Sequence, residues 1–192
     1  MAILVDTNNL LRSLYPDHPH YSAAGSALAA LQRHSETLYL APQNLVEFWA
    51  VATRPRSENG LGMPPARAAS EIATLRRFFR LLPWTLEVLE EWQRLVVDLG
   101  VSGKLTHDAH LVAVMQVYGV TDILTFNVAD FRRFPAFRCS TRCNSRPAPQ
   151  KYRGGSGTAA PSLRGSDAPK FTPVAELWTT TWPPPISLEK SP

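Results

Sequence analysis

Short apolar runs alternate along the chain with longer stretches in which apolar residues recur at helical spacing. The run Ala-Ile-Leu-Val at 2–5 stops at Asp6, which is typical of a buried strand. The same patterns predict further strands at 37–41, 79–82 and 123–126, and helices at 21–33, from Pro42 onward, at 65–78, 86–99 and 106–118. Short strands that alternate with helices favour right-handed crossovers and a mostly parallel sheet. The pattern therefore predicts an α/β fold with a central sheet flanked by helices.

Residues 139–192 differ in composition from residues 1–138. They hold 9 of the 17 prolines, and positions 140–170 show no sustained apolar period of either kind. Segments of this composition bury too little apolar surface to offset the entropy of folding. We therefore place a domain boundary near Arg138 and predict that 139–192 is a mostly disordered tail rich in Pro, Arg and Ser.

The net charge of +4 lies entirely in this second segment. Residues 1–138 carry 13 basic and 13 acidic side chains, whereas residues 139–192 carry 7 and 3. The positive net charge of the protein therefore gives no indication that the first segment has a surface that binds nucleic acid. No apolar run reaches the roughly 18–20 residues of a membrane span, and two cysteines are too few for a disulfide framework. We expect a cytoplasmic protein with no membrane association.

Acidic side chains follow the predicted strands or lie near the starts of predicted helices. Asp6 ends the first strand, Glu47 lies within an apolar helix, and Asp108 opens another helix. Asn127 and Asp130 follow the strand predicted at 123–126. Each residue alone has an ordinary explanation, such as a helix cap for Asp6 or a favourable dipole interaction for Asp108. Ligands of parallel α/β sheets bind at the carboxyl ends of strands, so together these residues indicate a site.

Such a set of oxygen donors suits a hard divalent cation. Mg²⁺ and Mn²⁺ bind through few carboxylates, keep several waters and also take substrate phosphate. A cation held in this way orients a water and stabilises charge on a phosphodiester. His107 and His110 have a His-x-x-His spacing, but no set of Cys or Glu partners completes a zinc site around them, so solvated or supporting roles are favoured.

Four segments carry most of this polar chemistry. They are Val-Asp-Thr-Asn-Asn-Leu-Leu at 5–11, the segment 42–48, His-Asp-Ala-His-Leu at 107–111, and Thr-Phe-Asn-x-x-Asp-Phe at 125–131. In order and spacing they resemble the motifs of PIN-domain ribonucleases, and most closely those of VapC-like toxins of bacterial type II toxin–antitoxin modules. The resemblance covers about residues 1–137. It implies a three-layer PIN-like fold and a Mg²⁺-dependent endoribonuclease that cuts RNA and is held by a cognate antitoxin.

The resemblance also implies roles for single residues. Asp6 and Asp108 would bind Mg²⁺, or Mn²⁺ in its place, and Glu47 and one further acid would complete the cluster. The family often has Asp where Asn127 stands here. Either Asp130 supplies the fourth carboxylate, or Asn127 serves with its neutral amide.

The end of the chain departs from the family pattern. A last short strand should begin near Phe137 and Arg138, but the residues from Cys139 onward bring no β-branched alternation. We therefore expect this strand to be lost. The tail is then either the product of a shifted reading frame or a basic segment that adds contacts to RNA phosphates.

Two other functions remain open. One is a non-catalytic PIN-fold module that binds RNA or a protein. The other is a phosphotransferase with Asp6 as nucleophile, which fits less well because Asn8 stands where haloacid-dehalogenase-like enzymes need a second Asp.

The helices at 65–78 and 86–99 are expected to pack as a pair. Phe78, Trp84 and Trp92 near this pair either belong to the core or line a groove for an antitoxin helix or for homodimerisation. The expected partners are thus RNA, a cognate antitoxin and a second copy of the chain.

Overall fold

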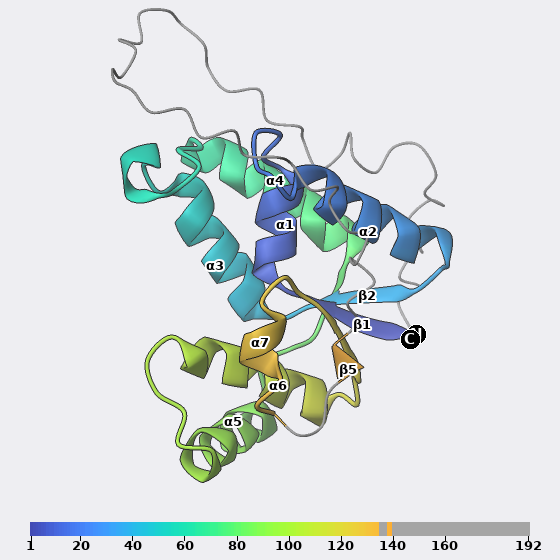
Figure 1. Cartoon of the computed structure of the whole chain (residues 1–192), viewed down its shortest axis with the longest axis vertical. Coiled ribbons are helices and arrows are strands. Elements are labelled where there is room, and N and C mark those ends of the chain that lie inside the picture. Colours follow the sequence, from blue (N-terminus) through green and yellow to red (C-terminus); the bar gives the residue numbers. More distant parts are fainter. Residues whose placement is uncertain (135–137, 140–192) are drawn as a thin grey trace, which may run out of the picture.

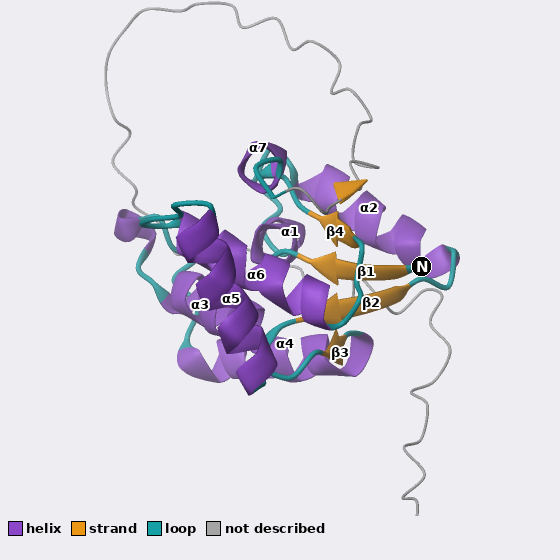
Figure 2. Ribbon diagram, turned by 90° about the horizontal axis from the view of Figure 1, so that it is seen from below, coloured by secondary structure: helices purple, strands orange, loops and turns teal. Residues whose placement is uncertain are grey.

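The computed structural model describes residues 1–134 and 138–139, and a five-stranded sheet forms its centre (Figures 1 and 2). The strands are β1 (Ala2–Val5), β2 (Thr37–Leu40), β3 (Arg80–Leu81), β4 (Asp122–Leu124) and β5 (Arg138–Cys139). Their order in the sheet is β3-β2-β1-β4-β5, and every neighbouring pair is parallel. β1 therefore lies at the centre, and the chain leaves it at Asp6.

Helices connect these strands. The described residues form α1 (Thr7–Ser13), α2 (Tyr21–Arg33), α3 (Pro42–Thr53), the 3-10 helix η1 (Arg56–Glu58), α4 (Pro65–Phe78), α5 (Leu86–Asp98), α6 (Leu105–Val117) and α7 (Val128–Phe131). None of these described helices is long and apolar enough to cross a membrane.

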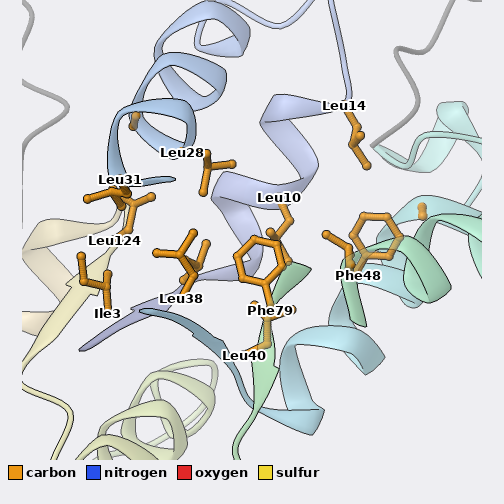
Figure 3. Packing of buried hydrophobic residues seen from close by; sticks show 14 of the residues in the cluster. Ile3, Leu10, Leu14, Leu28, Leu31, Leu38, Leu40, Phe48, Phe79 and Leu124 are labelled. Atoms are coloured by element: carbon orange, nitrogen blue, oxygen red, sulfur yellow. The ribbon is translucent and has the colours of Figure 1, made fainter. Parts of the chain in front are cut away.

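Two hydrophobic cores lie on opposite faces of the sheet. Ile3 and Val5 of β1 pack with residues of α1, α2, α3 and α4 in the first core, part of which Figure 3 shows. Leu4, which points the other way, packs with α5, α6 and α7 in the second core. Accordingly, α1 to α4 lie on one side of β1 and β2, and α5 and α6 lie on the other (Figure 1). The predicted three-layer α/β architecture with a parallel sheet is confirmed.

The prediction that α4 and α5 form a packed pair is wrong. α4 packs against α3 and the first core, whereas α5 packs against α6 in the second core. Phe78 consequently contacts the first core and Trp92 the second, while Trp84 is exposed. These aromatics do not form the predicted groove, because Phe78 and Trp92 pack against cores on opposite faces of the sheet.

Two helix predictions also need correction. The sequence predicts a helix at 106–118, but α6 begins one residue earlier, at Leu105, and Thr106 Oγ1 donates to the Gly103 carbonyl (2.7 Å) from within the first turn. The short helices α1 and α7 were not predicted, because one or two turns carry too little apolar periodicity to be recognised. Asp6 caps α1 directly, so the chain turns from strand to helix without a loop.

The expectation that the last strand is lost is also wrong. Asp122 of β4 pairs with Arg138, and Ile123 pairs with Cys139, which makes β5 a parallel edge strand of two residues. The boundary predicted at 138/139 therefore falls inside β5. The predicted disorder of the remaining tail, 140–192, lies outside the described residues.

Candidate active site

Asp6 lies at the carboxyl end of the central strand, where donors from α1 and from the end of β4 fix the orientation of its side chain. Its side chain is only 6% exposed. Oδ2 accepts hydrogen bonds from Thr125 Oγ1 (2.6 Å) and from Asn8 Nδ2 (2.5 Å). The Asp6 backbone N–H donates to the Leu124 carbonyl (3.0 Å), so β4 holds this residue through main chain and side chain alike.

Two asparagines join the start of α1 to the end of β4. Asn9 is fully buried, and its Nδ2 donates to the Leu124 carbonyl (2.8 Å) and to Asn8 Oδ1 (3.0 Å). Asn8 Oδ1 also accepts a hydrogen bond from the Phe126 N–H (3.3 Å). Since buried polar groups without partners are unfavourable, these bonds specify one arrangement of the two strand ends. That arrangement positions the Asp6 carboxylate.

Glu47 lies on α3 and is held from both sides. Its Oε2 accepts a hydrogen bond from Thr7 Oγ1 (2.8 Å), and Thr7 Oγ1 in turn accepts one from Asn44 Nδ2 (3.1 Å). Its Oε1 accepts a hydrogen bond from Gln43 Nε2 (2.6 Å) and lies 3.6 Å from His107 Nδ1. Glu47 therefore connects α1, α3 and α6, and its carboxylate is half-buried.

Asp108 completes a group of interacting carboxylates, which we call the acidic cluster: Asp6, Glu47, Asp108 and Asp130. Burial raises the pKa of Asp6 to about 6, and the charge of Glu47 adds to this rise. Burial likewise raises the pKa of Asp108 to about 6, with additional contributions from Asp6, Asp130 and Glu47. Like charges raise one another's pKa only when they are near. The four carboxylates therefore share one electrostatic environment.

The two candidates for the fourth position differ in their placement. Asp130, in α7, is half-buried and its charge acts on Asp108. Asn127 is exposed just before α7, and its backbone N–H donates to Thr125 Oγ1 (2.9 Å). The fold thus places Asp130 in the acidic cluster and leaves the Asn127 side chain exposed to solvent.

The donor chemistry of the acidic cluster fits a hard divalent cation. Carboxylate oxygens are the preferred ligands of Mg²⁺, and a cation between them would offset the burial and the like charges that raise the pKa of Asp6 and Asp108. Within residues 1–134 and 138–139, however, no three His, Cys, Asp or Glu side chains converge closely enough to form a ready-made metal cage. Mg²⁺ tolerates this, because it binds through one or two carboxylates and retains waters.

The sequence did not single out the side chains that orient these acids. Thr7, Gln43 and Thr125 donate to cluster carboxylates, but Thr and Gln at such positions have no distinguishing pattern. Thr125 had one usable signal, since it directly follows the buried β4 run. His110, the second histidine of the His-x-x-His pair, is buried against the Trp84 ring (4.6 Å between centroids) and lacks a hydrogen-bond partner within the described part of the chain.

Several solved structures share this fold. VapBC2 from Rickettsia felis, solved bound to a DNA fragment from the promoter, matches at 13% identity and a TM-score of 0.55, covering 71% of this chain and 96% of that one. VapBC-1 from nontypeable Haemophilus influenzae matches at 13% identity and 0.54, covering 72% and 96%. VapC20 from Mycobacterium tuberculosis, a toxin that cleaves the Sarcin-Ricin loop, matches at 19% identity and 0.53, covering 68% and 93%.

At these identities the structural likeness establishes the fold. No match was found among the curated proteins. A family model described as the PIN domain matches residues 3–136, a span that includes every member of the acidic cluster and all of the described sheet except Ala2 and β5. The chain therefore belongs to the PIN-domain family.

Proposed function

We propose that this protein is a Mg²⁺-dependent endoribonuclease that acts in the cytoplasm as the toxin of a type II toxin–antitoxin module. The observation that carries the proposal is the acidic cluster itself. Four carboxylates from separate elements interact electrostatically at the end of the central strand, and two of them have a pKa raised to about 6. Carboxyl groups whose pKa is raised by burial and by neighbouring carboxylates gather at sites that bind a cation or react.

In this proposal Asp6 and Asp108 hold the metal ion, with Mn²⁺ as an alternative to Mg²⁺. Mg²⁺ supplies positive charge that makes water more acidic and neutralises the scissile phosphate. Thr125 and Asn8 keep the Asp6 carboxylate in one orientation. We assign Glu47 to orienting the attacking water, because donors on both of its oxygens hold it in place.

The proposed protein partner is a cognate antitoxin. Support comes from the fold shared with chains of the Rickettsia and Haemophilus VapBC structures. An acidic site that takes a cation also suits an antitoxin Arg or Lys side chain, which would compete with the metal. We further propose a homodimer, which sedimentation of the purified chain will test.

A second candidate function is a PIN-fold module that binds RNA or protein without cutting it. The absence of a ready-made three-ligand metal cage in the described residues favours this reading. The two functions differ in one measurable property, because only the nuclease requires a divalent cation for its effect on RNA.

The test is metal-dependent RNA cleavage by the purified full-length chain, in Mg²⁺, in Mn²⁺ and in EDTA. Asp6→Asn and Asp108→Asn should each reduce cleavage by at least about 100-fold, because several kcal/mol of charge stabilisation in the transition state is lost. Asp98→Asn is the matched control, since Asp98 is exposed on α5 and contacts only Arg94 within the described residues. Circular dichroism verifies folding. Cleavage in EDTA would contradict the proposed metal dependence, and full activity of Asp6→Asn would contradict the proposed active site.

A further inference from the structure

A cavity of about 320 Å³ lies beside the acidic cluster, between α1 and the loop that follows α3. Asn8 connects the two, because it lines this cavity and also donates a hydrogen bond to Asp6. We call this space the flanking cavity. Its polar lining comprises Asn8, Arg12, Tyr15, His18, Arg56 and Asn59.

The flanking cavity has the opposite charge character to the acidic cluster. Arg12 contributes from α1 and Arg56 from η1, so cations lie on both walls, and the lining contains no Asp or Glu among the described residues. Burial lowers the pKa of Arg12 and the charge of Asp6 raises it, which places this guanidinium within the field of the cluster. Guanidinium groups recognise phosphate through paired hydrogen bonds.

Aromatic rings continue from the cavity toward the cluster. The ring centroids of Tyr15 and His18 are 6.3 Å apart, those of His18 and His20 5.5 Å, and those of His20 and Phe126 5.0 Å. We call these four rings the aromatic strip. It ends next to the acidic cluster, since the Phe126 N–H donates to Asn8 Oδ1.

Both arginines are placed against this strip. The Arg12 guanidinium lies 4.3 Å from the centroid of the Phe126 ring, and that of Arg56 lies 5.8 Å from the centroid of Tyr15. Burial lowers the pKa of His18, and the charges of Arg12 and His20 add to this fall. Aromatic rings interleaved with guanidinium groups suit single-stranded nucleic acid, because its bases stack on rings while its phosphates contact cations.

The second wall of the cavity has a defined shape. Gly62 N–H donates to the Arg54 carbonyl (2.8 Å) and Leu61 N–H to the Val51 carbonyl (3.0 Å), which fold the loop back onto α3. At Gly60 a Cβ atom would lie 2.1 Å from the Arg54 carbonyl oxygen, so a side chain there would force the backbone apart. The loop therefore presents Arg56 from a fixed position.

We propose that the flanking cavity and the aromatic strip bind the single-stranded RNA segment that adjoins the cleaved phosphodiester. This proposal rests on the proposed ribonuclease function and adds to it the surface, and the residues, that hold the RNA beside the acidic cluster. Arg12 and Arg56 contact phosphates, and Tyr15 and His18 stack with an unpaired base. Duplex RNA is a poor ligand, because its bases are already stacked in the helix and present only their edges.

The test is fluorescence anisotropy with a labelled single-stranded RNA oligonucleotide and full-length protein carrying Asp6→Asn, which keeps the RNA intact. In this background Arg56→Ala should raise Kd about tenfold, and the slope of log Kd against log salt should fall by about 0.7, the loss of one phosphate contact. Tyr15→Leu should raise Kd about tenfold through lost stacking. Arg94→Ala, on the exposed face of α5 where Arg94 pairs with Glu91 and Asp98, should leave Kd unchanged.

Each outcome separates the two proposals. If Arg56→Ala and Tyr15→Leu bind RNA like Arg94→Ala, the strip is not the RNA site, whether or not the parent chain cleaves RNA. If the parent chain shows no metal-dependent cleavage but loses affinity with both substitutions, the nuclease proposal fails and the RNA site stands. Equal affinity for a duplex of the same sequence, or binding of an acidic polypeptide with no binding of RNA, overturns the strip proposal. Melting temperatures show which variants remain folded, and Tyr15→Phe, which keeps the ring, should restore affinity.

Discussion

The acidic cluster and the flanking cavity meet at Asn8, yet they are constructed in different ways. The cluster gathers residues from β1 through α7 and holds them with hydrogen bonds, several of them buried. The cavity draws on two short segments, 8–18 and 51–61, and its rings and cations lie nearer the surface. In the cluster, hydrogen bonds hold the carboxylates in place despite their like charges. In the cavity, residues that are close together in the sequence supply the rings and the cations. The difference predicts that changes in the cluster affect stability and chemistry together, and changes in the cavity mainly affect binding.

The largest expected effect is on the pH dependence of stability. Burial raises the pKa of Asp6 in the folded state to about 6, above the ordinary value of 3.8, so the folded state holds this proton more tightly than the unfolded state. The contribution of Asp6 to the free energy of unfolding is therefore most favourable below about pH 4 and falls as pH rises through 6. At 1.36 kcal/mol per pKa unit the loss approaches about 3 kcal/mol. Asp108 acts in the same direction but less strongly, because water screens its half-exposed carboxyl.

Urea unfolding from pH 4 to 8 measures this contribution. The difference between the parent chain and Asp6→Asn should grow in favour of the variant from pH 4 to 7. At pH 7.5, Mg²⁺ should stabilise the parent chain and have little effect on Asp6→Asn. A difference that does not change with pH would show that folding does not raise the pKa of Asp6.

Asp6 and Asp130 were selected from the sequence because they follow predicted strands, and Glu47 and Asp108 because of their places in predicted helices and in the family motifs. The fold followed from the same periodicities, and the helix bounds 21–33 and 65–78 agree with α2 and α4. The pairing of α4 with α5 was wrong because an apolar stripe shows that a face is buried and not which element covers it. The donors Thr7 and Thr125 were missed because hydroxyl groups occur throughout the chain, and only the packed structure shows which of them meet a carboxylate.

The second prediction removes one of these donors. Thr125→Val keeps the shape of the side chain but leaves Asp6 Oδ2 and the Asn127 N–H without the hydroxyl. The free energy of unfolding should fall by about 1–3 kcal/mol, as expected for lost buried hydrogen bonds. Cleavage should fall about 10–100-fold, the usual effect of losing a partner that orients a metal ligand. Thr125→Ser should recover most of the activity, and a Val variant with full activity would show that Asp6 needs no such support.

The third prediction tests the cavity wall. Gly60→Ala places a methyl group against the Arg54 carbonyl and should lower the free energy of unfolding by about 1–3 kcal/mol. RNA affinity should fall with it, because Arg56 moves. Gly25→Ala on α2 is the matched control, since a Cβ there has open space. That substitution should stabilise the chain by up to about 1 kcal/mol, the difference in helix propensity. Equal thermal stability of the two variants would contradict a fixed loop.

The smallest effect should distinguish the two candidates for the fourth cluster position. The charge of Asp130 contributes to the raised pKa of Asp108. The Asn127 side chain, in contrast, is exposed, and the Asn127 backbone N–H makes the contact to Thr125. Asp130→Asn should therefore reduce cleavage about tenfold, equivalent to about 1.4 kcal/mol in the barrier, and should raise the Mg²⁺ concentration needed for half-maximal rate. Asn127→Ala retains the backbone bond and should change the rate less than threefold. Metal titrations of cleavage by both variants measure this, and the reverse order would place the Asn127 amide in the site and make Asp130 a surface acid.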